Sequence, residues 1–193
     1  MTAAVKGHGM CAMNHSGGFS KALSAAIIGN ATLAAAIVIG GSVTPPPARA
    51  VIDDIAINGR YTATSLGNWA KTNDAYHNEA TVRSTWILSS SCTTAQDCTG
   101  RVSSDQGWSA PLYTNDGEMW YVKHDVPHWE TCADGSTNTG HQVFMFYPVD
   151  ENGNVQTGSS TLAGVDKTLG PSGACRVNKW LNIEMPFRLD KIS

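Results

Sequence analysis

The sequence predicts an all-β fold: an antiparallel up-and-down barrel, or a barrel-like sandwich, of about eight strands with two disulfides. Strand-like runs bounded by Gly, Asn, Asp and Pro are frequent after residue 50, and helical periodicity is hard to find there. Four of the five cysteines also lie in this part of the chain. Short strands at near-regular spacing are typical of closed antiparallel sheets.

The expected strands can be justified in chain order. Thr81 to Ser91 places Val82, Trp86 and Leu88 on one face, and His141 to Val149 is densely apolar. The other predicted strands are weaker or shorter. They are Gly59 to Trp69, Cys98 to Ser104, Trp108 to Tyr113, Glu118 to His124, Leu162 to Thr168, Arg176 to Met185 and Phe187 to Ile192.

Two turns between these strands carry strong hairpin signals. Asn115-Asp116-Gly117 and Glu151-Asn152-Gly153 each place Gly after Asp or Asn, where a tight turn needs a positive φ. The second also resembles the start of a calcium loop, but its Gly comes too early and the final Glu is missing. We interpret both as turns.

Residues 1–50 predict a secretory leader with a Pro-rich end. Lys6 and Lys21 precede an apolar run from Ala22 to Val43, and Ala48-Arg49-Ala50 is a small-x-small cleavage site. Cleavage between Ala50 and Val51 leaves residues 51–193 as a single exported β domain. The alternative is an uncleaved signal anchor, because an apolar run of about 20 residues can span a bilayer. Translation could also start at Met10 or Met13.

The cysteines after residue 50 favour disulfides over a metal site. An even number in an exported chain indicates two bridges, and three pairings are possible. Proximity favours Cys92–Cys98, which leaves Cys132–Cys175. The absence of a C-x-x-C pair argues against zinc.

The charge distribution excludes one class of partner. All 16 acidic residues but only 10 of the 13 basic residues follow residue 50, which gives that part a net charge of −6. An acidic surface without a Lys/Arg cluster argues against nucleic acid.

The six tryptophans have two interpretations. Large rings can simply fill a core, or they can line a ligand cup at the open end of a barrel. Trp108, Trp120 and Trp129 flank loops and are the first ligand-binding candidates, and Tyr121 and His124 are further candidates in the same segment. The candidate surface is the loop set from Gly107 to Asp134.

Motifs for catalysis or metal binding are weak. His124-Asp125-Val126-Pro127-His128 is dense in titratable groups, but Pro127 prevents a regular helix and the stretch is interpreted as a solvated loop. Gly107 to Pro111 lacks the second Gly of a nucleophile elbow, so Ser109 is interpreted as structural. We predict no metal, no cofactor and no catalytic residue.

Several scattered residues also carry a resemblance to a known group. They are Gly59-Arg60-Tyr61-Thr62, the spacing of Trp86 and Cys92, Cys132-Ala133-Asp134-Gly135 and the ending Pro186-Phe187-Arg188-Leu189. With these residues the chain resembles small exported mycobacterial proteins and the extracellular domains of some receptor-type serine/threonine kinases. The resemblance implies a location outside the cytoplasm and supplies no catalytic motif. A sensor role would need a separate partner.

The leading functional hypothesis is a non-catalytic binding or sensing module of the cell envelope, secreted or membrane-anchored. Its expected partner is an envelope lipid, a glycan or a membrane protein, and the protein is expected to be a monomer. One alternative is an envelope hydrolase that uses loop carboxylates such as Asp116, Glu118, Asp125 and Glu130. Another is a structural secreted protein without a small ligand. A hollow barrel lined by Trp favours the first hypothesis.

Overall fold

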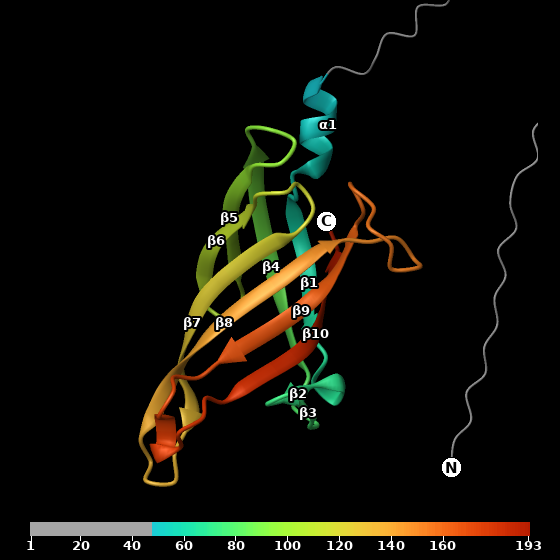
Figure 1. Ribbon diagram of the computed structural model, residues 1–193. Helices are drawn as coiled ribbons and strands as arrows, with labels where there is room; N and C mark the ends of the chain where they lie inside the picture. The colour runs from blue at the N-terminus through green and yellow to red at the C-terminus, as the bar shows by residue number, and fades with distance from the viewer. Residues whose placement is uncertain (1–47) are drawn as a thin grey trace, which may run out of the picture. The chain divides into compact units, whose positions relative to one another are not determined.

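The structure, a computed structural model, describes residues 48–193, which form a closed antiparallel barrel with one short added hairpin (Figure 1). The sheet order is β1-β4-β5-β6-β7-β8-β9-β10, pairing of β1 with β10 closes it, and β2 and β3 extend it beside β10. From β4 to β10 each strand pairs with the next, so the predicted up-and-down barrel of eight strands is confirmed. The elements are α1 (Ala48–Ile55), β1 (Gly59–Ser65), β2 (Lys71–Thr72), β3 (Ala75–Tyr76), β4 (Val82–Cys92), β5 (Cys98–Ser104), β6 (Ser109–Thr114), β7 (Trp120–Thr131), β8 (Thr137–Pro148), β9 (Thr161–Leu169) and β10 (Asn182–Lys191), with short 3-10 turns at Gly67–Trp69 and Ala174–Arg176.

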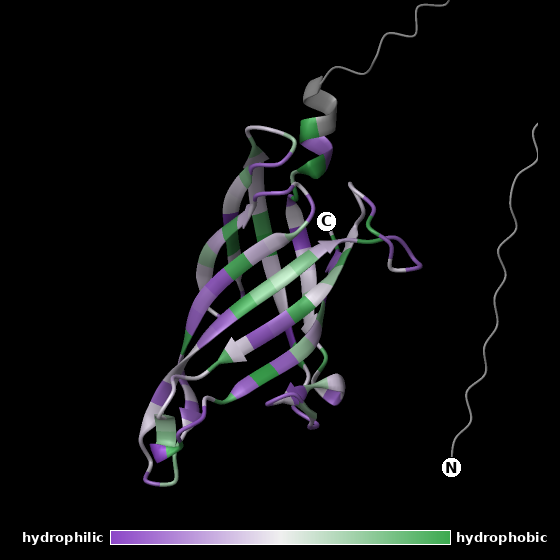
Figure 2. Ribbon diagram, in the orientation of Figure 1, coloured by the Kyte–Doolittle hydropathy of each residue, from purple (hydrophilic) through white to green (hydrophobic). Residues whose placement is uncertain are grey.

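Alternation of side chains along the strands builds the barrel interior. Successive strand residues point to opposite faces of a sheet, and Figure 2 shows hydrophobic and hydrophilic positions interleaved along the strands. Large apolar side chains fill the half of the barrel next to α1. Those that are fully buried include Leu112, Trp120, Phe146, Leu162 and Leu189.

The hairpin of β2 and β3 lies at the opposite end of the barrel from α1 (Figure 1). Asn73 and Asp74 have φ of 51° and 69°, which a two-residue primed turn requires. Asn73 is held from both sides, since its amide donates to the Asn182 carbonyl and its Oδ1 accepts from the Asn182 amide. This hairpin was not predicted from the sequence, because its strands have only two residues each.

Strand β7 continues past Pro127, although the sequence predicted a solvated loop there. The register with β8 shifts between Val126 and Glu130, and His128 has φ of 57°. Such a bulge accommodates Pro127, which has no backbone N–H to donate to the hydrogen bonds between strands. The β7–β8 hairpin therefore extends beyond the barrel at the end that also carries β2 and β3 (Figure 1).

The end of the chain also differs from the prediction. Arg176 to Met185 and Phe187 to Ile192 are not two strands: residues 176–181 precede the strand, and β10 runs unbroken through Pro186. The Pro186 carbonyl accepts from the Leu66 amide, one residue past the end of β1. Pro186 therefore lies beside the chain just after β1, where its lack of a backbone N–H costs no hydrogen bond between the two strands.

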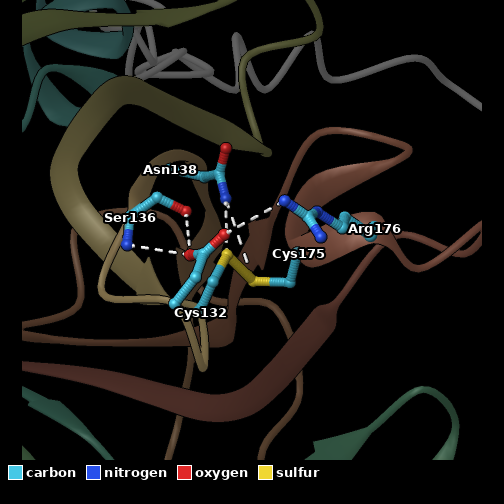
Figure 3. A network of polar contacts seen from close by, with 6 residues as sticks. Cys132, Ser136, Asn138, Cys175 and Arg176 are labelled. Atoms are coloured by element: carbon cyan, nitrogen blue, oxygen red, sulfur yellow. Dashed lines mark hydrogen bonds and ion pairs between the residues drawn. A yellow bond between two sulfur atoms is a disulfide. The ribbon is translucent and has the colours of Figure 1, made fainter.

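Both predicted disulfides are present. Cys92–Cys98 joins the facing ends of β4 and β5, and Cys132–Cys175 joins the β7–β8 hairpin to the loop before β10. Figure 3 shows the second bridge, where the Asn138 side-chain amide lies 3.4 Å from Sγ of Cys132 and Ser136 donates twice to Asp134.

The predicted apolar run of residues 22–43 lies outside the described residues. The predicted cleavage point, Ala50 and Val51, falls within α1. In the part of the chain that the structure describes, no helix is both long and apolar enough to cross a membrane.

Candidate functional site

A cavity of about 320 Å³ occupies the end of the barrel away from α1. It lies where β1 and β9 end and where β4 and β10 begin. The walls combine aromatic rings with a few polar groups. The lining residues are Ala63, Ser65, Glu79, Ala80, Val82, Ser84, Trp86, Gln106, Trp108, Val126, Trp129, Gln142, Phe144, Asp166, Thr168, Ile183, Met185 and Phe187.

Asp166 is the centre of the polar wall. It is 2% exposed, and its two carboxyl oxygens accept from the Ser65 hydroxyl at 2.6 Å and from the Gln142 side-chain amide at 2.7 Å. Asp166 lies on β9, Ser65 on β1 and Gln142 on β8. The three side chains form a row on the inner face of the barrel that passes over β10, the strand between β9 and β1. Burial raises the pKa of Asp166, and the two hydrogen bonds offset this effect only in part.

Trp86 closes the inner end of the cavity. Its ring is 1% exposed and meets the ring of Phe144 edge-on at 4.8 Å between centroids. It also meets Trp108 edge-on at 5.2 Å and Phe187 in a tilted arrangement at 5.1 Å. Aromatic pairs prefer edge-to-face contacts, so these rings form a rigid wall.

Trp129 forms another wall by packing over glycine. A Cβ atom at Gly140 would lie 2.7 Å from Cδ2 of Trp129 and 2.8 Å from Cγ2 of Thr168. At Gly170 it would lie 3.2 Å from Cζ3 of the same tryptophan. Gly140 is therefore needed to let a side chain from the irregular part of β7 reach the cavity.

His124 supports the cavity from behind. It does not line the space, but its ring stacks on Trp108 with 4.0 Å between centroids and 14° between planes. Burial lowers the pKa of His124 and outweighs the opposing influence of the Asp125 carbonyl and the Gln142 side chain. Its Nε2 is buried without a hydrogen-bond partner among the described residues.

Trp120 and Tyr121 lie away from the cavity, whereas His124 lies behind its wall without lining it. Trp120 is 0% exposed and packs in the filled half of the barrel, so the expectation that it flanks an open mouth is wrong. Its position at the start of β7 places it at the α1 end. Tyr121 lies on the outer face, where it stacks on Tyr113 and Lys123 lies over the Tyr113 ring. The structure thus brings Trp108 and Trp129 to one site and separates the other two.

The loop carboxylates expected for a hydrolase are not brought into one cleft. Asp116 and Glu118 lie in the β6–β7 turn, at the filled end of the barrel. Burial raises the pKa of Asp116, but amide hydrogen bonds from Glu118 and Met119 and the Thr114 hydroxyl outweigh it and hold this pKa below its usual value. Asp125 is exposed, 2.6 Å from His141 Nδ1, and Glu130 packs near Gly170.

Most of the cavity lining was not predicted from the sequence, and three of the missed residues are Gln142, Asp166 and Trp86. Gln142 and Asp166 are polar, and Trp86 was assigned only to a strand face. A signal was available: Gln142 is in phase with the buried Phe144 and Phe146, and Asp166 with the buried Leu162. A polar residue in phase with a buried strand face is unusual and indicates an interior polar site.

No three or more His, Cys, Asp or Glu residues gather in a metal-binding arrangement among residues 48–193. The histidines of the 124–128 stretch have separate partners. His128 contacts the Thr137 hydroxyl at 2.7 Å, whereas His124 contacts Trp108.

Ten chains of solved structures are similar to this chain. The chain is similar to the monomer form of the PknI sensor domain of M. tuberculosis, with 14% sequence identity and a TM-score of 0.46, over 72% of this chain and 88% of that chain. The resemblance to small exported mycobacterial proteins and to kinase extracellular domains stays an expectation. No family model matches the chain. No curated protein matches it either.

Proposed function

We propose that this protein is an extracytoplasmic binding module that holds one small, mostly apolar ligand in the cavity of its barrel. The observation that carries the proposal is the cavity itself, about 320 Å³ and lined by Trp86, Trp108 and Trp129. Small-molecule sites are commonly about 300–1,000 Å³ and are mostly apolar with a few polar groups.

The construction of the cavity supports a binding role. A barrel that needed only stability gains from filling its interior, because each buried apolar side chain contributes about 1.5–3 kcal/mol. Here the filled half stops at Trp86, and the other half holds buried polar groups such as Asp166 and Thr168. The wall is also fixed in shape, since Trp129 rests on Gly140 and Trp108 on His124.

The disulfides and the predicted leader support a location outside the cytoplasm. Disulfides persist in oxidising compartments and are rare in the cytosol. Both bridges close loops at the ends of the barrel, and neither lines the cavity. They stabilise the walls without taking part in binding.

Fluorescence titration tests the proposal. The purified protein is titrated with N-phenyl-1-naphthylamine, an uncharged apolar probe, and the tryptophan emission of the protein is followed. We expect saturable binding that an envelope lipid extract competes away. Gly140→Ala should weaken binding of the probe at least tenfold, because the new methyl group displaces Trp129 at a cost of about 1–3 kcal/mol. Thr139→Ala, the exposed neighbour on the same strand, is the control and should bind normally.

Two results would contradict the proposal. One is the absence of saturable binding to a protein whose circular dichroism shows intact β structure. The other is turnover of a glycan or ester substrate by the purified protein, which would favour a hydrolase with its carboxyl groups in this cavity.

A further inference from the structure

The charge of the cavity wall is of one sign. Asp166 and Glu79 both line the space, and none of the described lining residues is Lys, Arg or His. Glu79 lies nearer the outside, where its Oε1 contacts His77 Nδ1 at 2.9 Å and the Thr72 hydroxyl at 3.1 Å. A low-dielectric pocket with carboxyl groups and no cation attracts positive charge.

Asp166 has hydrogen bonds but no counter-charge. Buried charges in proteins are normally paired, because an unpaired ion loses its hydration without compensation. Asp166 takes part in none of the ion pairs of residues 48–193, which join exposed or half-buried groups elsewhere. The Ser65 and Gln142 donors orient the carboxyl group, but both are neutral.

The rings opposite this carboxyl group also suit a cation. Trp86, Trp108, Trp129, Phe144 and Phe187 line the same space. A cation within about 6 Å of a ring centroid is attracted to the face of the ring, most strongly for Trp, and desolvated contacts contribute about 2 kcal/mol. Aromatic cages are a recognised arrangement for quaternary ammonium ligands.

We propose that the ligand is an organic cation, an amine or quaternary ammonium group on an apolar body, with its charge held between the aromatic wall and Asp166. This rests on the proposed binding function and specifies its ligand class. The cation supplies the counter-charge that the fold does not provide, and the apolar body fills the space along Trp129.

The test compares a cation with its uncharged isostere. The full-length protein is titrated with choline, benzyltrimethylammonium and 3,3-dimethylbutan-1-ol, the uncharged isostere of choline, by tryptophan fluorescence and calorimetry. We expect both cations to bind saturably and the alcohol to bind at least tenfold more weakly than choline.

Matched variants connect this preference to the carboxyl group. Asp166→Asn keeps the shape and should weaken benzyltrimethylammonium binding at least tenfold, with binding of N-phenyl-1-naphthylamine changed less than twofold. Asp105→Asn removes the same charge from an exposed turn at the same end of the barrel and should bind both probes normally.

Cation affinity should also rise with pH as the buried Asp166, whose pKa is raised by burial, ionises. The groups that face Asp166 are Ser65 on β1, Gln142 on β8 and Thr168 on its own strand. Glu79 from the segment after β3 shares the cavity. Asp166→Asn should flatten most of this pH dependence.

The outcomes separate this inference from the function on which it rests. If the uncharged naphthylamine binds and the ammonium ions do not, or if Asp166→Asn leaves cation binding unchanged, the ligand class is wrong and the binding function stands. If neither kind of probe binds the folded protein, both proposals are overturned.

Discussion

We expect the buried Asp166 to lower the stability of the barrel at neutral pH. Burial raises its pKa in the folded protein, so the folded state keeps a proton that the unfolded chain releases. The free energy of unfolding is highest with Asp166 protonated, below the unfolded pKa of about 3.9. This stability is lost as the pH rises through the pKa of Asp166 in the folded protein. Asp166→Asn should therefore raise the free energy of unfolding at pH 7 and leave it almost unchanged near pH 3.5.

Urea unfolding at the two pH values measures this effect without ligand. Asp105→Asn is the control, because it makes the same substitution at an exposed position in a turn. A lower free energy of unfolding for Asp166→Asn at pH 7 would mean that the carboxylate stabilises the fold through Ser65 and Gln142. A group that costs stability at its working pH is more easily explained by binding than by folding.

At the scale of single residues, the wrong predictions have a physical cause. Proximity to a turn predicted exposure for Trp108, Trp120 and Trp129 alike, yet strand phase decides which face a ring occupies. Trp120 is the first residue of β7 and lies on the inner face at the filled end. Trp129 lies near the other end of β7, where the register shift lets its side chain line the cavity. Neither the direction of the strand nor this shift is visible in the local sequence.

At the scale of elements, the two disulfides should contribute unequally. Cys132–Cys175 closes a separation of 43 residues and Cys92–Cys98 one of 6. The chain-entropy relation gives about 4 kcal/mol for the first bridge and about 2 kcal/mol for the second. Replacing both cysteines of a bridge by Ser should lower the free energy of unfolding in that order.

Proteolysis adds a local readout of the same comparison. Without Cys132–Cys175, the segment before β10 loses its covalent tie to the β7–β8 hairpin, so trypsin should cut sooner at Arg176 and Lys179. Loss of Cys92–Cys98 should not accelerate these cuts. Equal losses of stability and equal cleavage rates for the two double variants would contradict this prediction.

The strands that the sequence predicted well are long and strongly patterned. Thr81 to Ser91 became β4 and His141 to Val149 lies almost wholly in β8, because alternation or a dense apolar run extends over most of each strand. The β2–β3 hairpin depends instead on its contacts with β10, and Pro186 is tolerated only because β1 ends beside it. Such features follow from neighbouring strands that are distant in sequence.

In the molecule as a whole, the first described element, α1, lies at the end of the barrel that apolar side chains fill. α1 leads into β1 at one end of the barrel (Figure 1). The residues that line the cavity lie toward the other end. Every residue that lines the cavity lies between Ala63 and Phe187, so removal of the leader takes away none of its wall. Ligand binding should therefore be the same for the cleaved and the full-length protein.

Removal of the leader is itself a testable prediction. The small-x-small site predicts cleavage between Ala50 and Val51, which lies inside α1. Helices this short are marginal in isolation, so α1 of eight residues presents a weak barrier to cleavage there. Intact mass and N-terminal sequencing of protein from culture filtrate and from membranes should both give a chain that starts at Val51. A membrane-bound form that keeps residues 1–50 would instead show a signal anchor.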